Sequence, residues 1–118
     1  MREQKTTHGG EDELGEVFAA LADPTRRRMV QELLRDGTTS VPALSAMLPI
    51  TRQAVAKHLS TLDHAGLVER APGVGREVRY RLRAGALSPA AAWLREAEAA
   101  WDRRLSRLKD AVERDGAR

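Results

Sequence analysis

The stretch LPITRQAVAKHLSTLDHAG, residues 48–66, carries the pattern that decides the fold. Val55, Leu59 and Leu62 recur at intervals of four and three residues, which predicts a helix with one apolar face. A threonine that can cap a helix precedes these residues, and a glycine that can end one follows them. The sequence therefore predicts a helix over residues 51–65 with its apolar face in a core.

The opposite face of this helix is small and polar. On a helical wheel, Gln53, Lys57 and Ser60 lie between about 140° and 200° from Val55. Gln can pair with adenine and Lys can reach guanine or phosphate, so this face suits the major groove of DNA. An ordinary solvated face fits this helix equally well. The candidate DNA-binding residues of the helix are Thr51, Arg52, Gln53, Lys57, His58, Ser60 and Thr61.

His58 flanks the core side of the helix, about 60° from Val55 on the same wheel. It is expected either to pack or to contact a phosphate. No second ligand lies at a spacing that would indicate a metal site.

Three shorter helices are predicted before this one. Residues 11–21 show helical apolar spacing, and Asp23 and Pro24 suit the N-cap and first position of a second helix. Ser40 suits the N-cap of a third helix. The apolar residues expected to face inward on the second and third helices are Met29, Val30, Leu33, Leu34, Leu44, Met47 and Leu48.

Two strand-like runs follow, LVERA at 67–71 and EVRYRLR at 77–83. The Pro and Gly residues between them predict a hairpin, here called the basic wing, residues 67–83. Apolar residues alternate with arginines in the second run, which predicts one packed face and one basic face. Glu69 or Glu77 is expected to pair with at least one arginine. The wing residues predicted to contact phosphates are Arg76, Arg79, Arg81 and Arg83.

A long helix is predicted from Ser88 to about Glu113, because apolar residues recur there every three or four positions. A core this small cannot cover the whole stripe, even with help from the first helix. An exposed apolar stripe of that length predicts an interface between two copies of the chain. The residues predicted to form this homodimer interface are Leu14, Val17, Phe18, Trp93, Leu94, Ala97, Trp101, Leu105, Leu108 and Val112.

Composition limits the classes of function. Residues 49–84 hold seven Lys or Arg and three Asp or Glu, so the basic excess of the 118-residue chain is concentrated there. No apolar run is long enough to span a membrane and no secretion signal is visible, so a cytoplasmic protein is expected. The chain has no cysteine and no catalytic pattern, so neither an enzyme, a cofactor nor a metal site is expected. Residues 1–10 are polar and predict a flexible tail before a single domain at 11–114.

The order of predicted elements is α-α-α-α-β-β-α, mainly α with one β-hairpin. A short helix, a turn, a helix with a polar outer face and a basic hairpin predict a winged helix-turn-helix. The helix at 51–65 would then lie in the major groove of double-stranded DNA and the wing along its backbone. Two copies related by a two-fold axis would read a palindromic operator.

Three motifs, FAALADPTRRRMVQELL, PITRQAVAKHLSTLDHAGLVE and GREVRYRLR, together resemble the ArsR/SmtB family of bacterial winged helix-turn-helix repressors. The resemblance covers roughly residues 14–112. It implies a homodimer built on the first and last helices, with residues 51–65 reading DNA. It also implies a transcriptional repressor that an effector releases.

The chain departs from the metal-sensing members of that family. Where some of them carry a Cys-x-Cys pair, residues 40–48 read SVPALSAML, and the last helix contains no histidine. Glu98, Asp102 and Glu113 are expected to be ordinary solvated carboxylates. The sequence therefore resembles the branch of the family without metal sites, and its effector is not visible.

Two other functions fit the same elements. One is a dimeric protein–protein interaction module that uses the basic hairpin or the last helix, with the hairpin docked on an acidic surface. The other is a winged helix that binds RNA.

Overall fold

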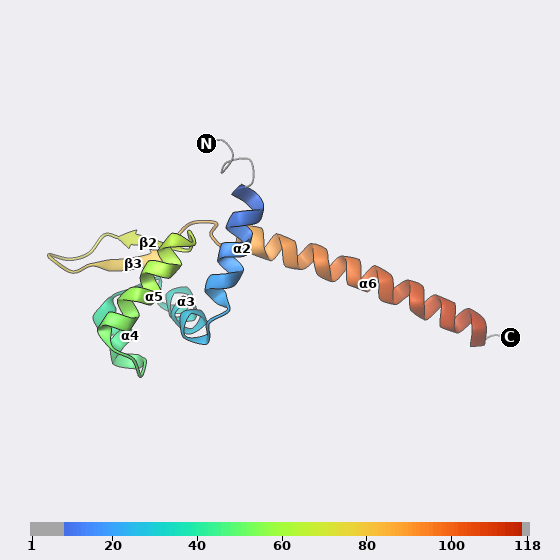
Figure 1. The fold of residues 1–118 in the computed structure, drawn as a ribbon, viewed down its shortest axis with the longest axis horizontal. Coiled ribbons are helices and arrows are strands. Elements are labelled where there is room, and N and C mark those ends of the chain that lie inside the picture. The colour runs from blue at the N-terminus through green and yellow to red at the C-terminus, as the bar shows by residue number, and fades with distance from the viewer. Residues whose placement is uncertain (1–8, 117–118) are drawn as a thin grey trace. The chain divides into compact units, whose positions relative to one another are not determined.

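The computed structural model describes residues 9–116, and the chain divides after Leu87 into two compact units. The second unit is one helix, α6 (Ser88–Gly116). The first unit contains every other element (Figure 1). These are α2 (Gly9–Leu21), α3 (Pro24–Asp36), β1 (Thr38–Thr39), α4 (Val41–Met47), α5 (Arg52–His64), β2 (Val68–Ala71) and β3 (Arg79–Leu82).

Side-chain caps determine where α3, α4 and α5 begin. Asp23, Ser40 and Thr51 each accept a hydrogen bond from the backbone N–H three residues further on, at 2.9, 3.2 and 3.1 Å. Each bond satisfies one of the N–H groups that a helix leaves free at its start. All three predicted N-caps are thereby confirmed.

The first helix begins earlier than predicted. α2 starts at Gly9, so residues 9 and 10, which were assigned to a flexible tail, are helical. The rest of the predicted tail, residues 1–8, lies outside the described residues.

The core of the first unit lies between α5 and its neighbours. Val55, Leu59 and Leu62 of α5 are exposed by 1% or less, as predicted. The other buried residues expected from the sequence are Met29, Val30, Leu33, Leu44 and Leu48.

Two residues expected in the core are exposed instead, Leu34 by 61% and Met47 by 37%. Leu34 follows Leu33 directly, so it points about 100° further around α3 and leaves the buried arc. Met47 is the last residue of α4, where no further helical turn covers it. The apolar residues that remain buried on these helices are enough to pack them.

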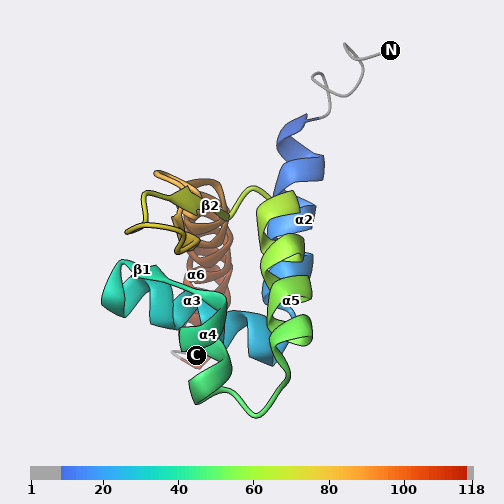
Figure 2. The same cartoon turned by 90° about the vertical axis from the view of Figure 1, so that its left-hand side faces the viewer.

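The hairpin belongs to a three-stranded antiparallel sheet in the order β1-β3-β2. β1 was not predicted, since two threonines give no periodic pattern. Val78 was expected on the packed face of the hairpin, but it precedes β3 and is 43% exposed. Figure 2 shows the turn that joins α4 to α5, the two helices of the predicted helix-turn-helix.

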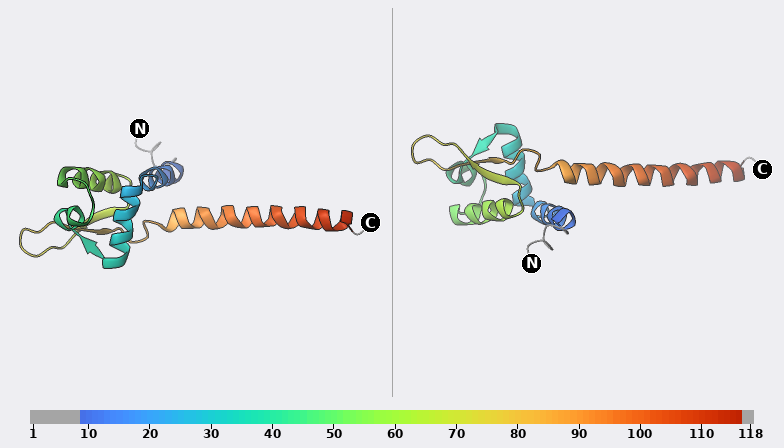
Figure 3. Two further views of the ribbon diagram at one scale, coloured as in Figure 1. Left: turned by 90° about the horizontal axis from the view of Figure 1, so that it is seen from below. Right: turned by 90° about the horizontal axis from the view of Figure 1, so that it is seen from above.

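α6 is a single uninterrupted helix of 29 residues (Figure 3). It ends three residues beyond the predicted boundary, at Gly116. No helix within residues 9–116 is both long and apolar enough to cross a membrane.

Candidate nucleic-acid interface

The outer face of α5 is polar and open to solvent. Arg52, Gln53, Lys57 and Ser60 are all exposed, while the apolar face of the same helix is buried. None of these four side chains forms an ion pair or hydrogen bond with another described residue. Four donors, two of them cationic, are therefore available on one helix surface to an external partner.

The remaining predicted contacts on α5 already have partners within the chain. Thr51 is the N-cap, and the hydroxyl of Thr61 donates to the backbone oxygen of Lys57 at 3.2 Å. His58 is half-buried, and its Nδ1 lies 3.3 Å from Nη1 of Arg26. Since a guanidinium only donates, Nδ1 is the acceptor, and His58 packs against α3. Packing was one of its two expected roles.

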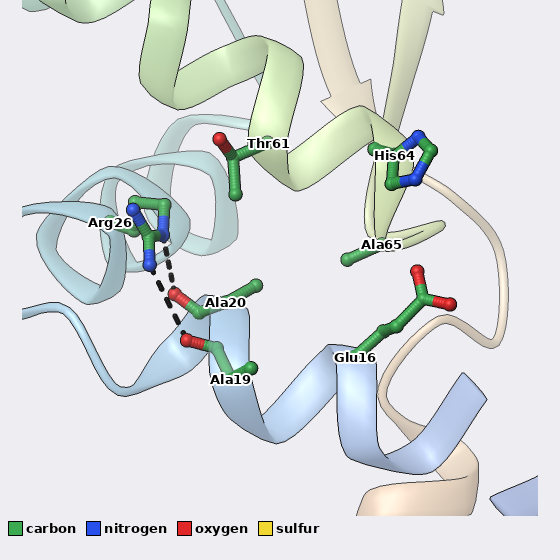
Figure 4. A pocket seen from close by; sticks show the side chains of 7 residues that line it. All are labelled: Glu16, Ala19, Ala20, Arg26, Thr61, His64 and Ala65. Atoms are coloured by element: carbon green, nitrogen blue, oxygen red, sulfur yellow. Dashed lines mark hydrogen bonds between the residues drawn. The ribbon is translucent and has the colours of Figure 1, made fainter. Parts of the chain in front are cut away.

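Arg26 holds α5 to the helices behind it, and the sequence did not single it out. Its Nε donates to the backbone oxygen of Ala20 at 2.7 Å, and its Nη2 to that of Ala19 at 3.4 Å (Figure 4). Both acceptors lie in the last turn of α2, where helical carbonyl groups lack a partner. Arg26 thus joins α2, α3 and, through His58, α5.

Asp23 completes this junction. The backbone N–H of Arg26 donates to its carboxylate and lowers the pKa of Asp23 below its ordinary value. Desolvation acts in the opposite direction, and the positive charge of the Arg26 guanidinium adds a smaller lowering effect. The carboxylate therefore stays ionised as the cap of α3 well into the acidic range.

A cavity of about 200 Å³ lies between α2 and α5. Ala19, Ala20 and Ala65 form apolar walls, with Glu16 and His64 at one end (Figure 4). Within residues 9–116 there is no group of three or more His, Asp or Glu side chains that could hold a metal ion. Independence from metals remains a prediction.

The basic wing contains two kinds of arginine. Arg79 Nη1 donates to Glu77 at 3.0 Å, and Arg79 Nε donates to Thr38 of β1 at 2.9 Å. Arg81 pairs with Glu69 at 2.9 Å. The expectation that an acidic residue pairs with a wing arginine is confirmed at both positions.

The other wing arginines are unpaired. Arg70, Arg76 and Arg83 form no ion pair with another residue of the described chain. Arg76 and Arg83 are the predicted phosphate contacts of the wing that have no ion pair with a described residue. The exposed cation Arg70 was not among the predicted contacts, because strand alternation alone does not show which arginines meet an acid.

The predicted dimer residues differ in exposure. Val17 is already buried in the single chain, at 7%, whereas Leu14 and Phe18 are half-buried. On α6 the large apolar residues are exposed by between 43% and 62%. They are Trp93, Leu94, Trp101, Leu105, Leu108 and Val112.

The chain is similar in sequence and structure to known transcriptional regulators. Residues 21–71 match a helix-turn-helix domain family. The HTH-type transcriptional regulator CmtR of Mycobacterium tuberculosis is 47% identical over 72 residues, which cover 61% of this chain and 59% of CmtR. The chain thus matches less than two thirds of the length of CmtR.

Two further similarities extend over most of both chains. The HTH-type transcriptional regulator Rv2034 of Mycobacterium tuberculosis is 36% identical over 100 residues, 85% of this chain and 89% of that protein. The solved structure of an ArsR-like transcriptional regulator from Rhodococcus sp. RHA1 is 46% identical. It superposes with a TM-score of 0.70 over 86% of this chain and 94% of its own.

Proposed function

This chain belongs to the ArsR family of transcriptional regulators, and we propose that it is a cytoplasmic repressor that binds double-stranded DNA sequence-specifically as a homodimer. α5 would lie in the major groove, with Gln53 and Lys57 towards base edges. The wing would lie along the DNA backbone. Two copies would read a palindromic operator whose half-sites are about 10 bp, or a multiple of that, apart.

The observation that supports this proposal is the division of α5 into two faces. Val55, Leu59 and Leu62 anchor the helix in the core, and Arg26 ties it to α2 and α3. The opposite face is left with polar side chains that have no internal partner. A helix fixed on one side and unpaired on the other is suited to carry side chains into a groove.

The homodimer is supported by α6. Its exposed apolar side chains are spaced every three or four residues over most of the helix, on one side of it. A second apolar surface is needed to remove that stripe from water, and the α6 of a second copy supplies one.

A footprint and mobility-shift titration on the promoter of the chain's own gene test the base contacts. Gln53→Ala should relax the preference at one base pair and weaken binding to the best site by about 1–3 kcal/mol. Arg103→Ala removes an exposed charge from α6 and serves as the control. An unchanged base preference in a folded Gln53→Ala protein would exclude Gln53 from base reading.

The salt dependence of binding tests the wing. Each phosphate contact that is lost lowers the slope of log K against log salt by about 0.9. Arg76→Gln should show that decrease. Arg81→Gln should show less, because Arg81 is held by Glu69. Equal slopes for Arg76→Gln and the wild type would mean that Arg76 does not touch DNA.

A further inference from the structure

A groove of about 470 Å³ lies between the start of α4 and one face of the β2–β3 hairpin. Its volume falls in the range of about 300–1,000 Å³ that is usual for small-molecule sites. The groove is separate from the outer face of α5, which contributes none of its lining. The lining residues are Ser40, Val41, Pro42, Arg70, Arg76, Glu77, Val78 and Tyr80.

The pleat of the hairpin explains which side chains reach the groove. Arg70 of β2 lies directly opposite Tyr80 of β3, so the two side chains share one face of the sheet. Glu69 and Arg81 are the next opposed pair, on the other face, where they form their ion pair. The paired strands therefore carry the Glu69–Arg81 ion pair on one face, and Arg70, which has no ion pair with a described residue, with Tyr80 on the other.

The charge in the groove is positive. Arg70 and Arg76 form no ion pair with a described residue, whereas the carboxylate of Glu77 is held by Arg79. The hydroxyl of Tyr80 adds a further donor. Two guanidinium groups and a phenol together suit a carboxylate, which accepts paired hydrogen bonds from arginine.

The other wall of the groove is apolar. Val41 and Pro42 line it from α4, and Val78, 43% exposed, lines it from the loop before β3. A phosphate of the DNA backbone has no apolar part that could pack against such a wall. An organic anion with an apolar body uses both the arginines and the wall.

We propose that this groove binds a small organic acid, with its carboxylate on Arg70 and Arg76 and its apolar body on Val41, Pro42 and Val78. The consequence for regulation rests on the proposed function. Arg76 engaged by the ligand is no longer available to a DNA phosphate, so the bound acid weakens the complex with DNA. The groove thereby provides an effector site in a chain that has no cysteine.

Titration with 3-phenylpropionate tests the binding step. Tyr80 is the single tyrosine of the chain, so a ¹³C-labelled tyrosine ring reports on this groove alone. The ring signal should shift saturably with 3-phenylpropionate and much less with the neutral 3-phenylpropanol or with inorganic phosphate. Arg70→Gln should weaken binding of the acid about tenfold or more, since it removes a charged hydrogen-bond donor.

Arg83→Gln is the matched control, because it removes an unpaired arginine near the hairpin that does not line the groove. Its affinity for the acid should equal that of the wild type. The proposal is overturned if the Tyr80 signal does not shift, if the alcohol or phosphate binds as tightly as the acid, or if Arg70→Gln, with an unchanged circular dichroism spectrum, binds the acid normally.

A mobility-shift titration with and without saturating 3-phenylpropionate tests the coupling. The acid should weaken DNA binding of the wild type about tenfold, because one charged contact with DNA is lost. The affinity of Arg70→Gln for DNA should be the same with and without the acid. An unchanged DNA affinity of the acid-bound wild type would overturn the regulatory role. Absence of any DNA binding would instead overturn the proposed function, and the Tyr80 titration would still decide the binding step.

Discussion

α5 and α6 have the same apolar spacing, but the apolar face of α5 is buried and that of α6 is exposed. Val55, Leu59 and Leu62 are exposed by 1% or less, whereas the large apolar residues of α6 range from 43% at Leu105 to 62% at Val112. Helical periodicity therefore predicts that a face will be buried, but it does not say which chain buries it. That difference separates a helix whose apolar face completes a core from a helix whose apolar face is exposed.

The polar faces of the two helices differ as well. On α5 the outward side chains are few and unpaired, Arg52, Gln53, Lys57 and Ser60. α6 carries both acids and bases along its length, and Lys109 lies 4.0 Å from Glu113 one turn further on. Charges that compensate one another suit a solvated surface, whereas the α5 face leaves its donors to an external acceptor.

The largest effect is expected on the free energy of unfolding, when a leucine of α5 is replaced by alanine and compared with the same replacement on α6. Leu59→Ala should destabilise the fold by about 2–5 kcal/mol, because Leu59 is buried and its loss leaves a cavity. Leu108→Ala, at a 61% exposed position, should cost less than about 0.5 kcal/mol in the dissociated chain. Denaturant unfolding at the lowest practical protein concentration measures both. Equal losses would mean that the apolar face of α6 is covered within one chain.

The next effect concerns association. Leu105→Glu places a carboxylate in the apolar stripe and should weaken the homodimer by about 2 kcal/mol or more. DNA affinity should fall with it, although α5 is untouched. Ser106→Glu adds the same charge on another side of α6 and should leave the dimer intact. Sedimentation at micromolar concentration compares the two, and a Leu105→Glu monomer that binds its operator tightly would contradict the dimeric model.

A smaller effect is expected at the start of α5. Thr51→Ala should destabilise the protein by about 0.5–2 kcal/mol, since it removes the acceptor for the backbone N–H of Ala54. Thr51→Ser keeps the hydroxyl and should stay close to the wild type. Thermal unfolding compares the three proteins. If the alanine and serine variants are equally stable, the hydroxyl cap at Thr51 does not contribute to the stability of α5.

The smallest effect depends on pH. The folded pKa of Asp23 is lowered, so the stability that its carboxylate supplies is present above the unfolded pKa of about 3.9 and is lost as the pH falls through the folded value. Asp23→Asn keeps a capping side chain without a charge. The wild type should melt slightly above Asp23→Asn at pH 6 or so, and the gap should narrow as the pH falls below the unfolded pKa. A constant gap over that range would show that the ionised carboxylate has no special role.

Local features of this fold could be predicted from the sequence. The caps at Asp23, Ser40 and Thr51 and the hairpin depend on contacts between residues a few positions apart, and such contacts leave patterns in the sequence. The two faces of α5 follow from the same periodicity. For these elements the amino-acid order alone was sufficient.

Contacts between distant residues were decided by the tertiary structure. Arg26 contacts His58, which is 32 residues away in the sequence, and Arg79 contacts Thr38, which is 41 residues away. No sequence pattern predicts contacts at such separations. β1 exists because β3 offers it a hydrogen-bonding edge. Pairing with Glu69 and Glu77 decides which wing arginines remain available. Such contacts depend on how the elements pack, because side-chain geometry across an interface is set by all the neighbours at once and not by the order of residues along one helix or strand.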